Sequence, residues 1–377
     1  TINDPYGITG TLEIEVSTRY EYDDMGRLAK VKQTNPGASE LTVAKYEYNA
    51  LGQLVDKKLH STHGTNYLQS VDMRYNIRGQ LLSINNSTRD YNINNNEDSD
   101  AGNDVFGMEI LYDNSETGLN TPRYDGMISA IKWSAGQTGS PVNSALRSYK
   151  YTYDNQYRLT GSTYQEKKNS TWTHNQGGFN ESMSYDENGN ITSLQRYAIL
   201  SNTVTQIDDL TYSYKNSNLS NQLDNIIDNI PGNTTGYGYR NFTGTTDVHP
   251  YSYDAGNGNL TGDLKKGTTI TYNELNKPTL IQISSTKKVA YRYDATGTRI
   301  SKIVTNNSTT KTIEYIGGYV IENDVLSYYS MAEGRVRNEG GGYGLSMKME
   351  YFITDHQGNT RVSFEDDGTN TNTAHLT

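Results

Sequence analysis

The chain of 377 residues contains no cysteine and few apolar residues. Without cysteine it can form neither disulfides nor thiolate metal sites, and it has no cysteine nucleophile. Apolar residues make up 33% of the chain and the mean hydropathy is −0.79. No apolar run approaches the roughly 20 residues that a membrane-spanning helix needs. No segment carries a sustained helical period either, so we expect little helix.

Positive charge is also scarce. The formal net charge is −10, the pI is near 5.2, and no basic stretch alternates with aromatic residues. Binding to nucleic acid requires a positive face against the phosphates, so we expect no nucleic-acid partner. The segment Thr1–Pro5 has neither the basic nor the apolar region of a signal peptide, and we expect the chain to be an internal segment of a longer protein.

Tyrosine is abundant, with 32 residues. A compact domain with so few apolar residues would tend towards disorder. Each tyrosine, however, can bury a large ring while its hydroxyl reaches water or a partner. Tyrosine also suits the half-buried face of a β-sheet. We therefore expect an ordered all-β protein with a thin core.

A Tyr-x-Tyr-Asp motif repeats along the chain. Its first copies start at residues 20 and 46, and a degenerate copy, Met-Arg-Tyr-Asn, starts at residue 73. A period of roughly 20 to 30 residues indicates units that stack on one another. The copies that define the repeat contain Tyr20, Tyr22, Asp23 and Gly26; Tyr46, Tyr48 and Gly52; Tyr151, Tyr153 and Asp154; Tyr251, Tyr253 and Asp254; and Tyr291, Tyr293, Asp294 and Gly297.

Each copy is interpreted as a β-hairpin. Side chains alternate along a strand, so both tyrosine rings lie on one face. The Asp or Asn that follows can start a turn, and the glycine three residues later can supply the positive φ that ends a four-residue loop. We predict hairpin loops with positive φ at Gly26, Gly52, Gly79, Gly189 and Gly297.

Polar insertions interrupt the repeat. Residues 92–104, 167–179 and 216–235 are predicted as loops, with a short strand possible at 223–227, and the glycine-rich segment 334–344 is predicted as a hinge. Residues 11–16 alternate as a strand does, and residues 347–364 are predicted as a hairpin that closes on residues 355–359.

Two further stretches sharpen the pattern. Asp104–Glu109, with Tyr124–Ser129 and Trp133, resembles a segment of Tyr-Asp repeat proteins from Bacteroidetes. Residues 351–362 contain Asp355, His356, Gly358 and Arg361 in the order Tyr-x-x-x-Asp-His-x-Gly-x-x-Arg. Together with about ten Tyr-Asp units, these stretches resemble the RHS (rearrangement hotspot) or YD-repeat family over essentially the whole chain.

The resemblance implies a long antiparallel β-ribbon that spirals into a hollow shell, divided into repeats (residues 1–344) and the start of the RHS-associated core region (residues 345–377). It implies a secreted or cell-surface bacterial protein whose shell encloses or presents a C-terminal toxin or effector. The partners implied are the rest of the same polypeptide, the enclosed cargo, and secretion or cell-surface apparatus. The alternative is an adhesin whose surface binds glycans or proteins.

Five places in the sequence contain residue types that could support chemistry or metal binding. Asp355 and His356 could support acid–base work with Arg361, but a hairpin turn explains the same residues. The Asp4–Gly7 segment resembles a self-cleavage motif at the wrong end of the chain. His60 with His63 lacks a third metal ligand, residues 98–102 have imperfect calcium-loop spacing, and residues 256–259 are a turn. We therefore predict no catalytic residue, cofactor or metal in this segment.

Overall fold

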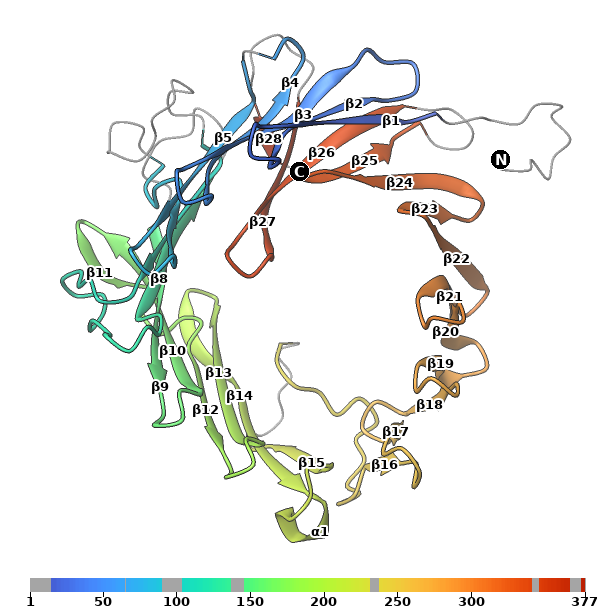
Figure 1. Ribbon diagram of the computed structural model, residues 1–377. Helices are drawn as coiled ribbons and strands as arrows, with labels where there is room; N and C mark the ends of the chain where they lie inside the picture. The colour runs from blue at the N-terminus through green and yellow to red at the C-terminus, as the bar shows by residue number, and fades with distance from the viewer. Residues whose placement is uncertain are drawn as a thin grey trace, which may run out of the picture. The chain divides into compact units, whose positions relative to one another are not determined.

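The structure is a computed structural model in which residues 15–64, 66–89, 104–136, 146–230, 237–340, 346–366 and 374–376 are described. Its strands form two antiparallel sheets, of 15 and 13 strands (Figure 1). Within the described residues, helix is confined to α1 (Lys215–Asn218), and even there Asn216 and Ser217 have positive φ. The predicted all-β class with minor helix is confirmed.

The chain divides into two compact units. Unit 1 comprises Thr1–Ser115, Thr121–Ser148 and Gly318–Thr377, and unit 2 comprises Glu116–Asn120 and Tyr149–Gly317.

The strands of unit 1 are β1 (Ser17–Tyr22), β2 (Leu28–Thr34), β3 (Leu41–Tyr48), β4 (Leu54–Ser61), β5 (Gln69–Tyr75), β6 (Leu81–Ile84), β7 (Phe106–Leu111), β8 (Ala130–Ala135), β23 (Tyr319–Glu322), β24 (Val325–Met331), β25 (Gly334–Asn338), β26 (Met347–Thr354), β27 (Thr360–Asp366) and β28 (Ala374–Leu376).

The strands of unit 2 are β9 (Leu146–Tyr153, most of which it contains), β10 (Leu159–Lys168), β11 (Thr171–His174), β12 (Glu181–Tyr185), β13 (Ile191–Leu200), β14 (Thr203–Tyr214), β15 (Leu223–Asp228), β16 (Tyr251–Tyr253), β17 (Leu260–Asp263), β18 (Thr268–Tyr272), β19 (Pro278–Ser284), β20 (Lys287–Tyr293), β21 (Arg299–Asn306) and β22 (Thr309–Ile316).

Strand order follows chain order. In unit 1, β1 to β8 pair consecutively, and so do β23 to β28. In unit 2 one hairpin arm departs from this order, because β11 pairs only with β10 and β12 also pairs with β10. Such sequential antiparallel pairing needs only short connections, which the frequent turn residues of this sequence supply.

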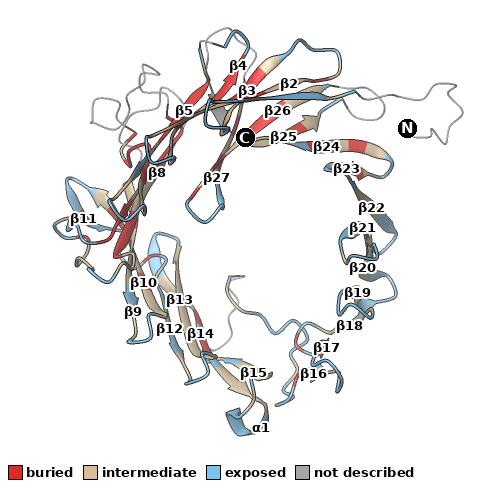
Figure 2. Cartoon of the chain, in the orientation of Figure 1, coloured by how far each residue is buried: buried red, intermediate tan, exposed pale blue. Residues whose placement is uncertain are grey.

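The core of unit 1 forms where its C-terminal strands pack against its N-terminal strands. The Tyr329 hydroxyl on β24 donates to Asn35 Oδ1 at 2.8 Å, and His60 Nδ1 on β4 lies 3.1 Å from the Tyr351 hydroxyl on β26. Fully buried side chains on both sets of strands surround these contacts; they include Val31, Val43, Leu59, Val71, Val336, Tyr351, Ile353 and Phe364. Figure 2 shows the buried residues along β2 to β5 and β24 to β27.

An ion pair joins the same two sets of strands. Glu333, in the turn between β24 and β25, accepts from the Tyr46 hydroxyl at 2.9 Å and lies 2.7 Å from Lys57 Nζ. The Lys57 side chain is only 8% exposed. A buried ammonium group is costly without a partner, so Glu333 stabilises the folded state by supplying the counter-charge for Lys57.

Unit 2 has a thinner core, because most residues of β13 and of β18 to β22 are half-buried or exposed. Its main aromatic cluster places the Tyr164 ring 5.3 Å from Tyr149 and 4.9 Å from Phe179. Trp172 donates to Glu116 at 2.9 Å. Unit 2 therefore needs few apolar residues, because little of its sheet is fully buried.

Two loop predictions were wrong. Within 167–179 the chain forms the hairpin of β10 and β11, whose turn residues Asn169 and Ser170 both have positive φ, as a two-residue hairpin turn requires. Within 334–344, residues 334–338 form strand β25. A Cβ on Gly334 would lie 2.0 Å from the Glu350 carbonyl oxygen, so this glycine permits close strand packing and is no hinge.

Other predictions are confirmed or untested. Residues 223–227 lie in strand β15, and residues 347–364 form the β26–β27 hairpin. Residues 4–7, 11–14, 92–103 and 341–344 lie outside the described residues. The boundary between residues 344 and 345 stays a prediction about family organisation.

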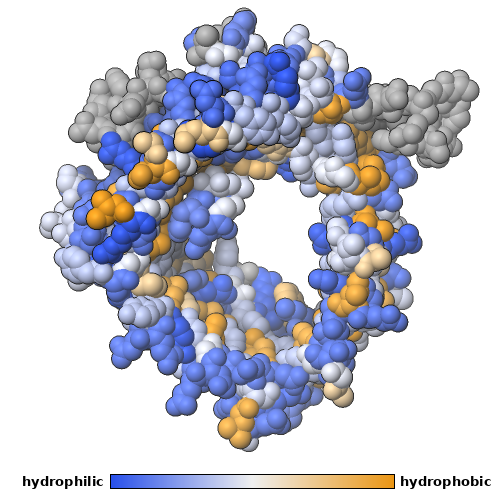
Figure 3. Space-filling view, in the orientation of Figure 1, coloured by the Kyte–Doolittle hydropathy of each residue, from blue (hydrophilic) through white to orange (hydrophobic). Residues whose placement is uncertain are grey.

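The face shown in Figure 3 is mostly hydrophilic, and its apolar side chains form small separate patches. Of the residues that the structure describes, none belongs to a helix long and apolar enough to cross a membrane.

Replacing Glu333 with Gln should lower the free energy of unfolding by about 1–3 kcal/mol, because the buried Lys57 ammonium loses its counter-charge. Urea denaturation measures the change. Glu40→Gln is the control. Glu40 pairs with Arg19, and the two side chains are 44% and 55% exposed, respectively. The loss in this variant should stay below about 0.5 kcal/mol. Equal effects would contradict a structural role for the Lys57–Glu333 pair.

Candidate functional site: the hairpin turns and the signature turn

The hairpin turns share one hydrogen-bond pattern, which the first turn shows completely. The Asp23 N–H donates to the Arg27 carbonyl, and the Gly26 N–H donates to the Asp23 carbonyl, both at 2.9 Å. Asp23 Oδ1 also accepts from the Met25 and Arg27 N–H groups, each at 2.9 Å. The carboxylate thus bonds backbone donors that would otherwise be left to solvent.

The loop contains three residues between its paired ends, one fewer than predicted, followed by the irregular strand pairing of a bulge. The same end-to-end bond recurs from Asn49 to Gln53, Asn76 to Gln80, Asp154 to Arg158, Asp186 to Asn190, Asn273 to Lys277, Asp294 to Thr298 and Asp355 to Asn359. The Asp254 turn is one residue longer and ends at Asn259.

Positive φ at the five predicted glycines is confirmed, with values of 76°, 80°, 78°, 86° and 84° at Gly26, Gly52, Gly79, Gly189 and Gly297. Gly358 has the same conformation, at 82°. In two turns another residue takes this place, namely Tyr157 and Asn276.

The second tyrosine of the repeat connects successive hairpins. The Tyr48 hydroxyl donates at 2.9 Å to the carbonyl of Leu28, the residue that begins the returning strand of the preceding hairpin. The same bond, at 2.7–3.3 Å, joins Tyr75 to Leu54, Tyr112 to Leu81, Tyr185 to Leu159, Tyr214 to Ile191, Tyr253 to Leu223, Tyr272 to Leu260 and Tyr293 to Pro278. We call this set the tyrosine ladder.

The turns also touch one another through the residue that closes each loop. The Arg27 guanidinium lies 4.7 Å from the centre of the Tyr48 ring, and Arg158 lies at the same distance from Tyr185. Arg158 Nη1 also donates to the Asp186 carbonyl at 2.8 Å. Each arginine therefore contacts the aromatic ring that leads into the next turn, a favourable cation–π arrangement.

The first tyrosine of the repeat has no common partner. Tyr20 is 54% exposed, whereas Tyr46 bonds Glu333 and Tyr251 lies 3.1 Å from the Tyr239 hydroxyl. Tyr151 stacks on Tyr149 at 6.3 Å, and Tyr291 lies 6.5 Å from Tyr293. The contact that recurs from repeat to repeat is therefore made by the second tyrosine and not by the first.

The pKa shifts of the turn carboxylates and ladder tyrosines are consistent with these hydrogen bonds. The hydrogen bond from the Arg27 backbone, supported by the Arg27 side chain, holds the pKa of Asp23 below its usual range. At Asp294 the Thr296 hydroxyl is the largest cause of a lowered pKa. Burial raises the pKa of Tyr75 and Tyr214, which keeps both hydroxyls protonated as donors.

The turn from Asp355 to Asn359, which we call the signature turn because it contains the Asp-His-x-Gly sequence, follows the same plan. Asp355 Oδ1 accepts from the Gln357 and Asn359 N–H groups at 2.9 and 3.0 Å, and Oδ2 accepts from Arg361 Nε at 2.8 Å. Burial pushes the pKa of Asp355 upward, but the bonds from Asn359 and Gln357 and the charge of Arg361 together hold it below its usual range.

The structure brings Asp355 and Arg361 together, while His356 is exposed and has no hydrogen bond to either. The carboxylate is occupied by its own loop, so this arrangement offers a structural turn and no aligned acid–base pair. Gly256 and Gly258 lie in the Asp254 turn, as expected of residues 256–259.

The two histidines considered as metal ligands do not converge. His60 contacts Tyr351, whereas His63 Nδ1 lies 2.8 Å from the Thr62 hydroxyl. In the part of the chain that the structure describes, no group of three His, Cys, Asp or Glu could hold a metal ion.

The sequence did not reveal the long-range pairs of unit 1, Tyr46 and Lys57 with Glu333 and His60 with Tyr351. The paired residues lie 276 to 291 positions apart and share no motif. In the ladder, by contrast, the repeat marks both partners, the second tyrosine and the first residue of a returning strand, although the bonded residues lie 12 to 31 positions apart.

The comparisons with known proteins bear on the fold. No family model matches the chain, and no curated protein matches its sequence. Solved structures do match: the crystal structure of TcdB2-TccC3-TEV, at 16% identity and a TM-score of 0.62, and that of TcdB2-TccC3 without hypervariable C-terminal region, at 16% and 0.61.

The Photorhabdus luminescens Tc holotoxin pore is similar in the same way, at 16% identity and a TM-score of 0.62. Each match covers 94% of this chain but only 16% of the other. The chain therefore shares its fold with a section of these toxin components.

Replacing Tyr185 with Phe should destabilise the chain by about 0.5–1.5 kcal/mol, since the Leu159 carbonyl loses its donor. The control is Tyr22→Phe, which changes the same repeat position where no described residue accepts a bond from the hydroxyl. Urea midpoints measure both variants. A Tyr22→Phe effect as large as that of Tyr185→Phe would show that the ladder bond contributes nothing.

Replacing Gly26 with Ala should lower the free energy of unfolding by about 1–2 kcal/mol, because a residue with a Cβ is strained at the φ of 76° found here. No neighbour lies within 4 Å of the new Cβ, so this loss would come from the backbone and not from a clash. Gly256→Ala tests the space argument alone, because its Cβ would also be free of contacts closer than 4.0 Å but its φ is not positive. Thermal denaturation should show a clear loss for the first variant and little change for the second. The reverse order would contradict the turn assignment.

Burial lowers the pKa of His60, although Asp366, 3.5 Å away, acts in the opposite direction. An unfolded histidine has a pKa of about 6.5, so below that pH the unfolded chain binds more protons and stability falls. His60→Gln should flatten the fall in Tm between pH 7 and 5, whereas His63→Gln, an exposed control, should not. Parallel profiles for His60→Gln and the unaltered chain would refute this role.

Proposed function

We propose that this chain is a section of the β-sheet wall of an RHS-type exported bacterial protein, which encloses or presents a C-terminal toxin or effector. The observation that carries the proposal is the tyrosine ladder. At eight places it joins a hairpin to the one before it through a hydrogen bond of one kind.

A wall has to be stable while burying little on its faces. The ladder and the turn contacts meet that need, since each hairpin is held by its neighbours and a thick core is unnecessary. The fold shared with sections of TcdB2-TccC3, one of whose structures lacks a hypervariable C-terminal region, supports a place in a toxin-related assembly.

Enclosure is tested with the full-length protein that contains this chain. Limited proteolysis should leave its C-terminal segment intact under native conditions and degrade it once the wall is opened by combined ladder substitutions such as Tyr75→Phe, Tyr185→Phe and Tyr253→Phe. A C-terminal segment digested equally fast with and without these substitutions would contradict enclosure. Density inside a closed wall by cryo-electron microscopy would provide independent support.

A further inference from the structure

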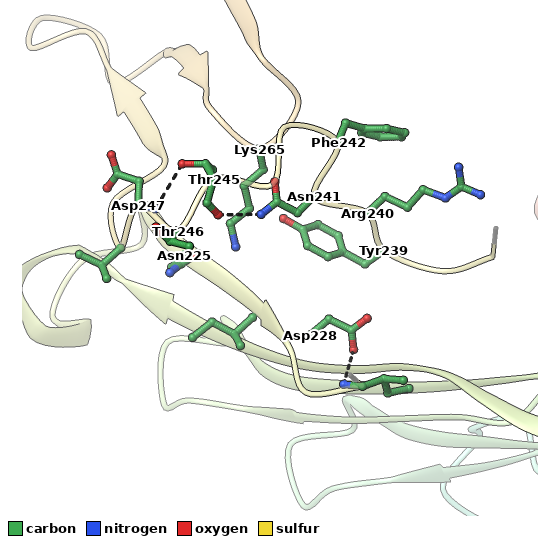
Figure 4. Close-up of a pocket in the computed structure, with 13 residues that line it drawn as sticks. Asn225, Asp228, Tyr239, Arg240, Asn241, Phe242, Thr245, Thr246, Asp247 and Lys265 are labelled. Atoms are coloured by element: carbon green, nitrogen blue, oxygen red, sulfur yellow. Dashed lines mark hydrogen bonds between the residues drawn. The ribbon is translucent and has the colours of Figure 1, made fainter. Parts of the chain in front are cut away.

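A pocket of about 620 Å³ lies in unit 2, between strand β15 and the segment that leads to β16. Figure 4 shows the side chains around it, with Asp228 and Asn225 from β15 facing Tyr239 to Asp247, and Lys265 from the β17–β18 turn. Its volume is typical of pockets that bind small ligands. We call it the β15 pocket.

Hydrogen bonds fix the walls of this pocket. The Tyr239 N–H donates to Asp208 Oδ1 at 2.5 Å, and Asn241 Nδ2 donates to the Thr245 carbonyl at 2.7 Å. The Thr243 hydroxyl donates to the Leu264 carbonyl at 2.7 Å, and Lys265 Nζ donates to the Ile226 carbonyl. The pocket is therefore formed before a ligand arrives, which reduces the entropy lost on binding.

The charges of the lining balance. Asp228 and Asp247 are acidic, and Arg240 and Lys265 are basic. A phosphate or sulfate ligand would need surplus positive charge, and a cation would need surplus carboxylates. The lining favours an uncharged ligand rich in hydrogen-bonding groups.

Several polar groups remain available to such a ligand. Asn225 Oδ1 accepts from the Ile226 N–H at 2.9 Å, and Asp247 Oδ1 accepts from the His249 N–H at 2.8 Å. The Asn225 amide donors, the second Asp247 oxygen and the Thr246 hydroxyl have no partner among the described residues. They supply both donors and acceptors, as adjacent sugar hydroxyls require.

Aromatic rings complete the lining. Tyr239 and Phe242 both line the pocket, and Phe242 is 68% exposed although it is a large apolar residue. The apolar C–H faces of a sugar ring can pack on such a side chain while the hydroxyls bond the polar groups. We propose that the β15 pocket binds a neutral oligosaccharide, independently of whether the protein encloses a cargo.

The test is binding of the full chain to an array of neutral, acidic and sulfated oligosaccharides, followed by calorimetry with the best neutral ligand. Phe242→Ala and Asp247→Ala should each weaken binding about tenfold, as loss of an anchor residue does. Tyr124→Ala is the control, because Tyr124 is 76% exposed and does not line the pocket. Circular dichroism confirms that each variant folds.

Three results would overturn the proposal. One is that no neutral oligosaccharide binds, and another is that only acidic or sulfated ones do. The third is that Tyr124→Ala weakens binding as much as Phe242→Ala. Binding that depends on Phe242 and Asp247 but not on Tyr124 supports it, whatever proteolysis shows about enclosure.

Discussion

The ladder bond, from the second tyrosine of a repeat to the carbonyl at the start of the preceding hairpin's returning strand, occurs eight times and is the contact on which the sheets most depend. It places the tyrosine ring between two neighbouring hairpins, and it pairs the tyrosine hydroxyl with a backbone carbonyl instead of with water. The adjacent turn supplies a matching contact, as Arg27 does over Tyr48 and Arg158 over Tyr185. Because the bond is local and repeated, the sheet extends without a thick core.

The two units use this plan differently. Unit 1 adds a true core where β24 to β27 pack on β2 to β5, with Tyr351 and Phe364 fully buried. Unit 2 depends more on the ladder and on aromatic clusters such as Tyr149, Tyr164 and Phe179. The β15 pocket lies where the repeat is interrupted between β15 and β16, and its lining residues between 239 and 248 belong to no strand, as is common for segments that bind ligands.

Sequence reasoning recovers whatever is encoded locally. Residue types at fixed offsets predict the positive φ of Gly26, the start of the returning strand at Leu28 and the turn at Asp355. The hairpin at Asn169 and Ser170 was missed because its second strand, β11, has only four residues, of which Trp172 alone is buried. The pairing of Lys57 with Glu333 could not be predicted, because it depends on which distant strands meet, and no spacing along the chain records that.

Nearest-neighbour coupling between hairpins is tested most directly by native-state hydrogen exchange on Tyr272→Phe, which removes the 2.8 Å bond to the Leu260 carbonyl. Faster exchange confined to the two hairpins that this bond joins, β16–β17 and β18–β19, is the expected result. Unchanged exchange in both hairpins, or an equal increase throughout the chain, would contradict it.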